Sequence, residues 1–222
     1  MEPIRVIWAG EREAHLLPSD GQSDRLYRTL ATSRLDEIEE VIPGSRTVQV
    51  RLRRGADPDG VMASVRAVLR DRDDVPASNA VRTVVIPVCY DAHLAPDLEW
   101  IARRAGLSED EAAELHASGD YTVRFLGFAP GFAYIDGLPE LLHVPRLDSP
   151  RARVAAGSVG ITGARTGIYP HASPGGWRLI GMTPLRLFDP MRDQPSMLGP
   201  GDRVRFQRIT RREFDALRAE PA

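Results

Sequence analysis

Short β-type runs separated by glycine and proline fill the second half of the chain, and they limit the possible folds more than any other feature. Four of these runs, within residues 121–209, read YTVRFLGF, GSVGITG, GWRLIGMTPLRLF and DRVRFQRI. Strands this short with so many turn residues are typical of a β-barrel or a β-sandwich. We expect two short helices before them, over residues 96–104 and 108–118, and a surface helix after them, over residues 211–218. Ser108, followed three residues later by glutamate, predicts a capping box.

The first eighty residues alternate instead between strand and helix patterns. Val48, Val50 and Leu52 alternate with polar residues, as in a half-buried strand. The predicted strands span residues 4–8, 37–42, 47–52 and 81–88, and the predicted helices span residues 22–32 and begin again at Pro58. The resulting order, βαββαβ, is that of ferredoxin-like domains. We therefore predict an α+β protein with an α+β domain over residues 1–80 and a β domain over residues 81–222.

Composition excludes several classes of function. The formal net charge of −2 over 222 residues gives no general attraction to nucleic acid or to anionic membranes. All basic side chains are arginine, so a Schiff-base lysine and the lysine of a phosphate-binding loop are both absent. The single cysteine, Cys89, cannot form an internal disulfide, and its apolar neighbours predict a buried thiol. No apolar run approaches the roughly 20 residues that cross a bilayer, so we expect a cytoplasmic protein without nucleic-acid or membrane partners.

The stretch GFAPGFAYIDGL, residues 127–138, is the strongest local candidate for a site. Its glycines permit backbone angles that other residues avoid, and its proline fixes one angle and removes a hydrogen-bond donor. Such a segment holds one particular path, as a tight core crossing or a binding loop does. Phe132 and Tyr134, together with Trp177, are candidates for an apolar wall against which a small substrate rests. Trp177 also fits core packing, and Asp136 is either a base or a turn residue.

Two arginines and a glycine turn supply the polar candidates. Arg146 and Arg151 each follow a proline, and a guanidinium group matches the geometry of a carboxylate or phosphate. Gly175 and Gly176 would expose backbone N–H groups to a ligand. Simpler interpretations stay open from spacing alone: surface ion pairs for the arginines and a tight barrel turn for the glycines. Ser158 begins a strand, where a hydroxyl more often satisfies a neighbouring backbone group than acts as a nucleophile.

Residues 127–184 closely resemble the KipI / allophanate hydrolase subunit 1 family; they read GFAPGFAYIDGLPELLHVPRLDSPRARVAAGSVGITGARTGIYPHASPGGWRLIGMTP. The likeness extends over nearly the whole chain, through IPVCYDAHLAPDLEWIA, ELHASGDYTVRFLGF and GPGDRVRF. It implies a small α+β N-terminal domain and a cyclophilin-like β-barrel C-terminal domain. It also implies a partner of the KipA / allophanate hydrolase subunit 2 type, which corresponds to the C-type component of a 5-oxoprolinase, and in addition an A-type component.

The resemblance implies a subunit of a heteromeric 5-oxoprolinase, a hydrolase that opens 5-oxo-L-proline to L-glutamate with ATP hydrolysis. This chain would form one half of a two-barrel site and would be active only within the complex. ATP would be bound by the complex, because the chain has no recognisable nucleotide-binding motif. Two alternatives stay open: a KipI-like inhibitor of a sensor histidine kinase, and one half of a biotin-dependent carboxyltransferase that acts on urea or a similar amide.

Carried over residue by residue, the family motif marks functional candidates in this sequence. The catalytic candidates are His116, Tyr134, Arg146 and Arg151. The substrate-binding candidates are Pro130, Gly131, Phe132, Ser158, Tyr169, Gly175, Gly176 and Trp177. No metal ligand is expected, since the five histidines stand far apart in the sequence. Met182 stands where the family usually has arginine; if that arginine contacts an anionic substrate, the methionine changes the ligand or lowers the activity.

Overall fold

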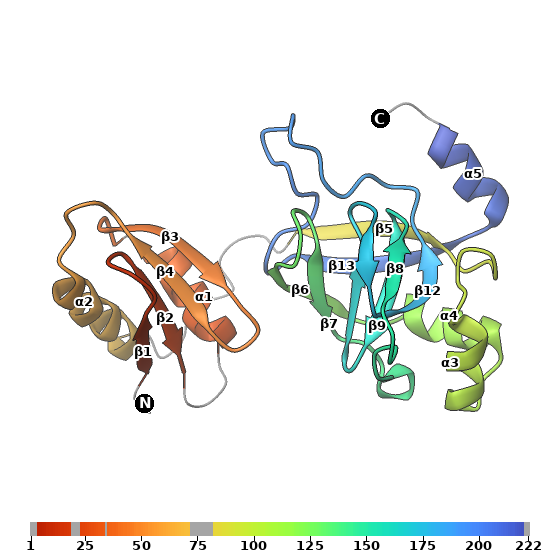
Figure 1. Ribbon diagram of the computed structural model, residues 1–222, viewed down its shortest axis with the longest axis horizontal. Coiled ribbons are helices and arrows are strands. Elements are labelled where there is room, and N and C mark those ends of the chain that lie inside the picture. Colours follow the sequence, from red (N-terminus) through yellow and green to blue (C-terminus); the bar gives the residue numbers. More distant parts are fainter. Residues whose placement is uncertain (1–3, 19–22, 34, 72–81, 220–222) are drawn as a thin grey trace. The chain divides into compact units, whose positions relative to one another are not determined.

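The computed structural model describes residues 4–18, 23–33, 35–71 and 82–219 (Figure 1). The chain divides into two compact units, residues 1–80 and residues 81–222, each with its own hydrophobic core. Gln22 and Val81, which begin two of the predicted elements, lie outside the described residues.

The first unit contains a four-stranded antiparallel sheet and two helices. Its elements are, in chain order, β1 (Arg5–Trp8), β2 (Glu13–Leu17), α1 (Ser23–Thr32), β3 (Ile38–Pro43), β4 (Val48–Leu52) and α2 (Pro58–Asp71). The strands pair in the order β1-β2-β4-β3. This ββαββα order differs from the predicted βαββαβ order in two respects. An additional strand, β2, follows β1, and the strand predicted over residues 81–88 belongs to the second unit.

One face of this sheet forms the core of the first unit. Along β4, the side chains of Val48, Val50 and Leu52 are buried, whereas the intervening polar residues are not. The buried residues form one apolar cluster with Leu30 of α1 and Val65 of α2. The period-two alternation of β4 and the apolar stripe of each helix therefore account for the packing of this unit.

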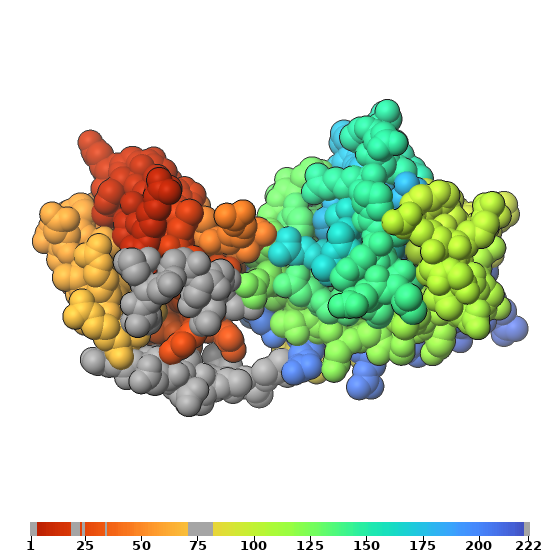
Figure 2. All heavy atoms as spheres, turned by 90° about the horizontal axis from the view of Figure 1, so that it is seen from below, coloured from red at the N-terminus to blue at the C-terminus, as the bar shows by residue number. Residues whose placement is uncertain are grey.

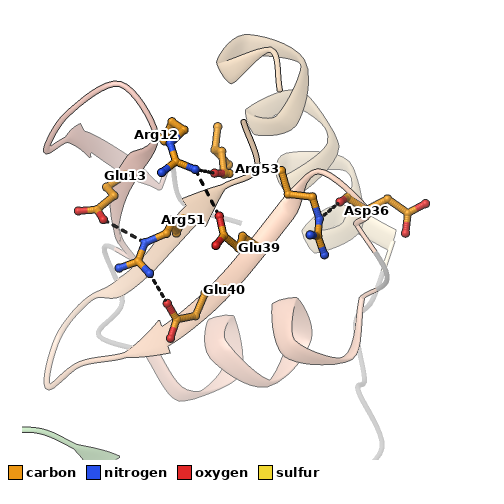
Figure 3. Close-up of polar contacts among 8 residues, drawn as sticks. Arg12, Glu13, Asp36, Glu39, Glu40, Arg51 and Arg53 are labelled. Carbon is orange, nitrogen blue, oxygen red and sulfur yellow. Dashed lines mark hydrogen bonds and ion pairs between the residues drawn. The ribbon is translucent and has the colours of Figure 1, made fainter. Parts of the chain in front are cut away.

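The other face of the sheet carries a ladder of ion pairs (Figure 3). Arg51 of β4 lies between Glu13 of β2, at 3.0 Å, and Glu40 of β3, at 2.8 Å. Arg12 reaches Glu39 at 3.3 Å. Exposed pairs of this kind contribute about 1 kcal/mol or less each. Burial of the opposite face is therefore the main source of stability in this unit.

Among the described residues, seven strands of the second unit close into a barrel, which confirms the predicted β core. These strands are β5 (Thr83–Cys89), β6 (Tyr121–Leu126), β7 (Ala133–Asp136), β9 (Ser158–Thr162), β10 (Arg165–Ile168), β12 (Arg178–Met182) and β13 (Arg203–Ile209). They pair in the order β10-β7-β6-β13-β5-β12-β9, and β9 returns to β10. Strand β13 runs parallel to β5 over seven residue pairs, while the other neighbours are antiparallel. Strands β8 (Arg151–Val154) and β11 (Ser173–Gly175) form a separate small sheet.

The helices of the second unit are α3 (Leu98–Ala105), α4 (Glu109–Ala117) and α5 (Arg211–Ala219). Helices α3 and α4 form a lobe on the barrel, seen in yellow-green in Figure 2. The predicted capping box is confirmed: Ser108 Oγ accepts the N–H of Glu111 at 3.2 Å, and the Glu111 carboxylate accepts the N–H of Ser108 at 2.8 Å. The thiol of Cys89 is buried as expected, in a cluster with Phe214 of α5.

Gly157 lies directly before β9, where the backbone passes very close to Thr183. Its φ is +83°, and a Cβ built there would overlap the carbonyl oxygen of Thr183. We expect Gly157→Ala to lower the free energy of unfolding by about 3 kcal/mol, because the left-handed backbone and the overlap both oppose a side chain. Urea denaturation of the two proteins measures this loss.

Gly201 provides the matched control for this prediction. Its φ is +89°, but nothing lies within 4 Å of a Cβ built there. Gly201→Ala should therefore cost only about 1 kcal/mol, the penalty of the backbone conformation alone. Equal losses in the two variants would show that the overlap at Gly157 has no energetic weight.

Candidate functional site

A cavity of about 620 Å³ lies where strands β7 and β10 meet Trp177 and the loop that follows β7. That loop contains the short 3₁₀ helix η1 (Glu140–Leu142). Three of the residues selected from the sequence line the cavity: Tyr134, Arg146 and Trp177. The other polar and charged lining side chains are those of Asp136, Glu140, His143, Thr162 and Arg165.

Packed aromatic rings form the apolar wall of the cavity. The ring of Tyr134 is stacked on that of Phe125, with the centroids 4.4 Å apart and the planes 19° apart. It meets Trp177 edge-on at 5.7 Å and Phe132 at 5.1 Å. Phe132 and Tyr169 are each only 1% exposed, and they support the wall without lining the cavity. Because the rings fix one another's orientation, the surface offered to a ligand is preformed.

The cavity contains an ion-pair cluster around Asp136 and one arginine, Arg146, that is unpaired among the described residues. The carboxylate of Asp136 lies 2.7 Å from Nε of Arg165 and 3.8 Å from Nε of Arg124. Asp136 is therefore held by two cations. Arg146, in contrast, is exposed and makes no hydrogen bond or ion pair with the described residues. Its guanidinium group is available to a carboxylate or a phosphate.

Arg151 lies outside the cavity lining, and its guanidinium group is paired with other residues of the chain. One nitrogen lies 2.8 Å from the carboxylate of Asp97, and another donates to the carbonyl oxygen of Trp177 at 3.4 Å. Asp97 is 7% exposed, and its second oxygen accepts the N–H of Leu179 at 2.6 Å. Arg151 thus joins β8 to the start of α3 and to β12.

His116 on α4 is fully buried and also lies outside the cavity lining. Thr166 Oγ1 donates its hydrogen to the carbonyl of Gly160 at 3.2 Å, so it accepts a hydrogen from Nε2 of His116 at 3.1 Å. Nδ1 of His116 then accepts the hydroxyl hydrogen of Tyr90 at 2.7 Å. Both nitrogens of this neutral ring are paired, and burial lowers the pKa of His116 to about 3. In this arrangement the ring joins α4 to the barrel strands.

The glycine and proline candidates lie outside the cavity lining: Pro130 and Gly131 form a turn before β7, Gly175 ends β11, and Gly176 follows it. A Cβ on Gly175 would overlap the hydroxyl oxygen of Tyr169, so this position must lack a side chain for the tyrosine to fit. The carbonyl of Gly176 accepts the N–H of Leu147 at 2.8 Å. This bond fixes the residue that follows Arg146, and so it positions the start of the arginine side chain.

Ser158 and Met182 lie opposite each other on β9 and β12, away from the cavity. They are 2% and 8% exposed, respectively. Met182 packs in an apolar cluster with Cys89 and Phe214. Position 182 therefore contributes nothing to the lining of this cavity.

Three charged or titratable residues of the cavity, Glu140, Arg165 and His143, were not among the sequence candidates. Arg165 lies opposite Asp136 in the β7–β10 ladder, and this pairing can be recognised only when the register is known. His143 precedes Arg146 by three positions, and that spacing is its only signal in the sequence. Sequence patterns therefore identified the arginine that is free but not the histidine beside it.

No group of three histidine, cysteine or carboxylate side chains in the described ranges is placed to hold a metal ion. The helices in this part of the chain are all too short or too polar to cross a bilayer.

The chain matches the family described as carboxyltransferase domain, subdomain C and D, over residues 10–198. It is 47% identical over 174 residues to the B-type subunit of 5-oxoprolinase from Escherichia coli O157:H7, and the match covers 78% of each chain. It is 43% identical over 169 residues to the B-type subunit of 5-oxoprolinase from Bacillus subtilis (strain 168), with 73% of this chain and 70% of that relative covered.

Solved structures with similar folds extend this comparison. TTHA0988 matches 93% of this chain with a TM-score of 0.72 and 31% identity, and the match spans only 40% of TTHA0988. The protein PH0987 from Pyrococcus horikoshii matches 95% of this chain and 100% of its own, with a TM-score of 0.59 and 36% identity. The urea carboxylase of Kluyveromyces lactis matches 96% of this chain and 22% of its own, with a TM-score of 0.71 and 19% identity. At that identity, the likeness shows the fold alone.

The burial of His116 predicts a pH dependence of stability. Its pKa is about 3 in the folded state against 6.5 for the ordinary group, so between these values the unfolded chain binds a proton that the folded chain does not. The stabilising contribution of the neutral ring is therefore complete above pH 6.5 and is lost as the pH falls toward 3. We expect a slope of up to about 1.4 kcal/mol per pH unit in the free energy of unfolding.

Urea denaturation between pH 4 and pH 7 measures this slope in the wild type and in His116→Gln. The variant should be less stable at pH 7 and should show a shallower slope, because its buried side chain cannot take up a proton. His93 is exposed, so His93→Gln should keep the wild-type slope. Identical slopes in the wild type and His116→Gln would mean that this histidine is not the source.

Proposed function

The chain belongs to the family of carboxyltransferase domains, subdomain C and D, and we propose that it is the B-type subunit of a heteromeric, ATP-dependent 5-oxoprolinase. The observation that carries this proposal is the high identity to two relatives that are named as this subunit of 5-oxoprolinase, which extends over most of each chain. The cavity supports it, since an aromatic wall and a guanidinium group that is unpaired among the described residues suit a small ring that bears a carboxylate.

The chain supplies one half of the site in this proposal. The other half comes from a partner of the KipA / allophanate hydrolase subunit 2 type, the C-type component of a 5-oxoprolinase, whose barrel is similar. The complex also includes an A-type component. ATP is bound by the partners or at their junction. The seven-stranded barrel is, on this view, of the cyclophilin-like type that the family resemblance implies.

The candidate residues take two kinds of role. Arg146 holds the carboxylate of 5-oxoproline or a phosphorylated intermediate, and the rings of Tyr134 and Trp177 bear against the apolar edge of the substrate. Tyr134 is also one candidate for proton transfer. We assign a supporting role to the residues outside the lining: Phe132 and Tyr169 behind the wall, Pro130, Gly131, Gly175 and Gly176 in the backbone segments, the buried Ser158 and His116, and the half-buried Arg151.

A second function is favoured by one observation, the fold shared with urea carboxylase. The same cavity would then serve one half of a biotin-dependent carboxyltransferase that acts on urea or a similar small amide. The free guanidinium of Arg146 would hold a carboxylated intermediate in that case. Fold similarity alone carries less weight than extended sequence identity, because one fold serves many activities.

The proposal is tested by measuring ATP-dependent release of glutamate from 5-oxoproline. This chain is assayed alone and then as a purified complex with its co-expressed C-type and A-type partners. We expect turnover only in the complex, because the chain alone contributes one half of the site. A stable complex that releases no glutamate would overturn the proposal, and biotin-dependent carboxylation of urea by the complex would support the second function instead.

Arg146→Ala should damage substrate binding without damaging the fold. Arg146 is exposed and unpaired within the described residues, so the free energy of unfolding should change by less than about 0.5 kcal/mol. The loss of a charge-assisted hydrogen bond should raise the KM for 5-oxoproline by roughly 10- to 100-fold in the complex. Steady-state kinetics and urea denaturation provide the two measurements.

Two further arginines make this prediction specific. Arg153 on β8 is exposed and outside the cavity, so Arg153→Ala should leave both quantities unchanged. Arg151→Ala should instead lower the free energy of unfolding by about 2–3 kcal/mol, because it leaves the largely buried carboxylate of Asp97 without its cation. A KM increase for Arg151→Ala with unchanged stability would show that Arg151 binds substrate directly.

A further inference from the structure

His143 is a cavity residue to which the roles above assign nothing. Its Nε2 lies 2.9 Å from the backbone carbonyl oxygen of Leu138. A carbonyl oxygen only accepts hydrogen bonds, so Nε2 carries the hydrogen and donates it. A neutral imidazole has a single N–H, and Nδ1 of His143 therefore carries a lone pair.

The lone pair of Nδ1 is accessible. Nδ1 makes no hydrogen bond with the residues that the structure describes. It is also not a buried orphan, because the buried side-chain polar atoms without a partner in that part of the chain are Thr29 Oγ1 and Arg178 Nε. His143 is one of the residues that line the cavity, and its Nδ1 is not fully buried, so Nδ1 can accept a hydrogen bond from a bound molecule or from water.

The backbone holds His143 in place before any substrate binds. Its N–H donates to the carbonyl of Glu140 at 3.0 Å, which closes the 3₁₀ turn of η1. The residues on either side, Leu142 and Val144, are 1% and 3% exposed and are anchored in the barrel core. Val144 also forms a β-bridge with Gly163 of the β9–β10 turn. The N–H of Gly163 donates to the carbonyl oxygen of Val144 at 2.7 Å. Catalytic groups gain from such preorganisation, because no further ordering is needed during the reaction.

The charged groups that share the cavity with His143 come from each neighbouring element. They are Asp136 of β7, Glu140 of η1, Arg146 of the following loop and Arg165 of β10. Asp136 and Arg165 neutralise each other at 2.7 Å, whereas Arg146 is unpaired among the described residues. A substrate whose carboxylate rests on Arg146 therefore has its remaining polar group in the same cavity as Nδ1.

We propose that Nδ1 of His143 is the proton acceptor for the water that opens a small cyclic amide in this cavity. The inference rests on the proposed function, which supplies the amide, and adds a catalytic group to it. Arg146 and the aromatic wall hold the ring, and the carbonyl of Leu138 keeps the imidazole in the tautomer that can accept a proton. An imidazole suits this task because its charge changes near neutral pH.

The step is balanced as hydrolysis of the ring amide. As the water oxygen bonds to the carbonyl carbon, Nδ1 takes a water proton and the C=O electron pair moves onto oxygen. When the carbonyl re-forms, the C–N bond breaks with its electron pair on nitrogen, and the imidazolium returns the proton to that nitrogen. The products are a carboxyl group and an amine, and His143 is restored. The complex couples ATP hydrolysis to this ring opening, and the step assigns no residue of the cavity to ATP.

His143→Gln in the complete complex is the test, because glutamine keeps a donor for the carbonyl of Leu138 but has no basic nitrogen. We expect kcat for glutamate release to fall roughly 10²- to 10⁴-fold with little change in KM. A rate that depends on a general base declines toward acid pH, and we expect this acid limb of the pH profile in the wild type and not in the variant. Profiles between about pH 5 and pH 9 show the difference.

Three controls separate catalysis from structure. His93→Gln alters an exposed histidine outside the cavity and should keep the wild-type rate and profile. In Asp136→Asn and Glu140→Gln, kcat should still decline toward acid pH. This result would show that the decline comes from the imidazole and not from a carboxylate. If His143→Gln folds poorly, His143→Ala with added imidazole serves instead, and the small base should restore part of the rate.

The outcomes distinguish this inference from the function on which it rests. A wild-type complex that releases no glutamate overturns both. Wild-type turnover with an unchanged rate and acid limb in His143→Gln overturns the role of His143 alone. An acid limb that disappears in Asp136→Asn or Glu140→Gln but persists in His143→Gln gives the base to a carboxylate and also overturns it.

Discussion

The parallel pairing of β13 with β5 closes the barrel, and the remaining strands depend on it. Seven residue pairs, from Arg203 opposite Thr83 to Ile209 opposite Cys89, join segments that are far apart in the chain. Without them, both strands would present the open edges that folded proteins avoid. Arg82, just before β5, donates to the carbonyl of Met197 at 2.7 Å and pairs with the carboxylate of Asp202, just before β13. The site on β7 and β10 exists because this closure bends the sheet into a ring.

Two histidines of the second unit show how surroundings decide what the same side chain does. His116 has a hydrogen-bond partner on each nitrogen, no exposure and a strongly lowered pKa, so its ring acts as a polar joint within the core. His143 has one nitrogen bonded to a backbone carbonyl and the other unpaired among the described residues, at the edge of a cavity. A satisfied buried group specifies structure, whereas a half-satisfied group beside a cavity is available for chemistry.

Local signals in the sequence predicted the local features well. The capping box at Ser108, the short strands after Tyr121 and the buried thiol of Cys89 all follow from patterns within a few residues. Long-range pairing was harder to predict. Burial alternates along β2, with Ala14 and Leu16 buried, but the sequence obscures this pattern because the apolar Leu17 directly follows Leu16.

The same distinction applies to the candidate site. Tyr134, Arg146 and Trp177 stand out by residue type and by family motif, and they meet in one cavity. The motif also marks His116, although no local pattern shows that its partners are Tyr90, just after β5, and Thr166 of β10. The predicted βαββαβ order uses residues 81–88 as its last strand because they follow the first unit along the chain, whereas β5 pairs in parallel with β13, which begins at residue 203. The periodicity of residues along one strand predicts which side chains are buried, but it does not predict which strands pair or in which register.

A parallel seam also determines where the polypeptide enters and leaves the barrel. Because Thr83 lies opposite Arg203 and Cys89 lies opposite Ile209, β5 begins at one rim and β13 ends at the other, about 20 Å away. An antiparallel seam would bring both points to the same rim, as the two ends of a hairpin. A segment that precedes β5 therefore joins the barrel at one rim, and a segment that follows β13 leaves it at the opposite rim.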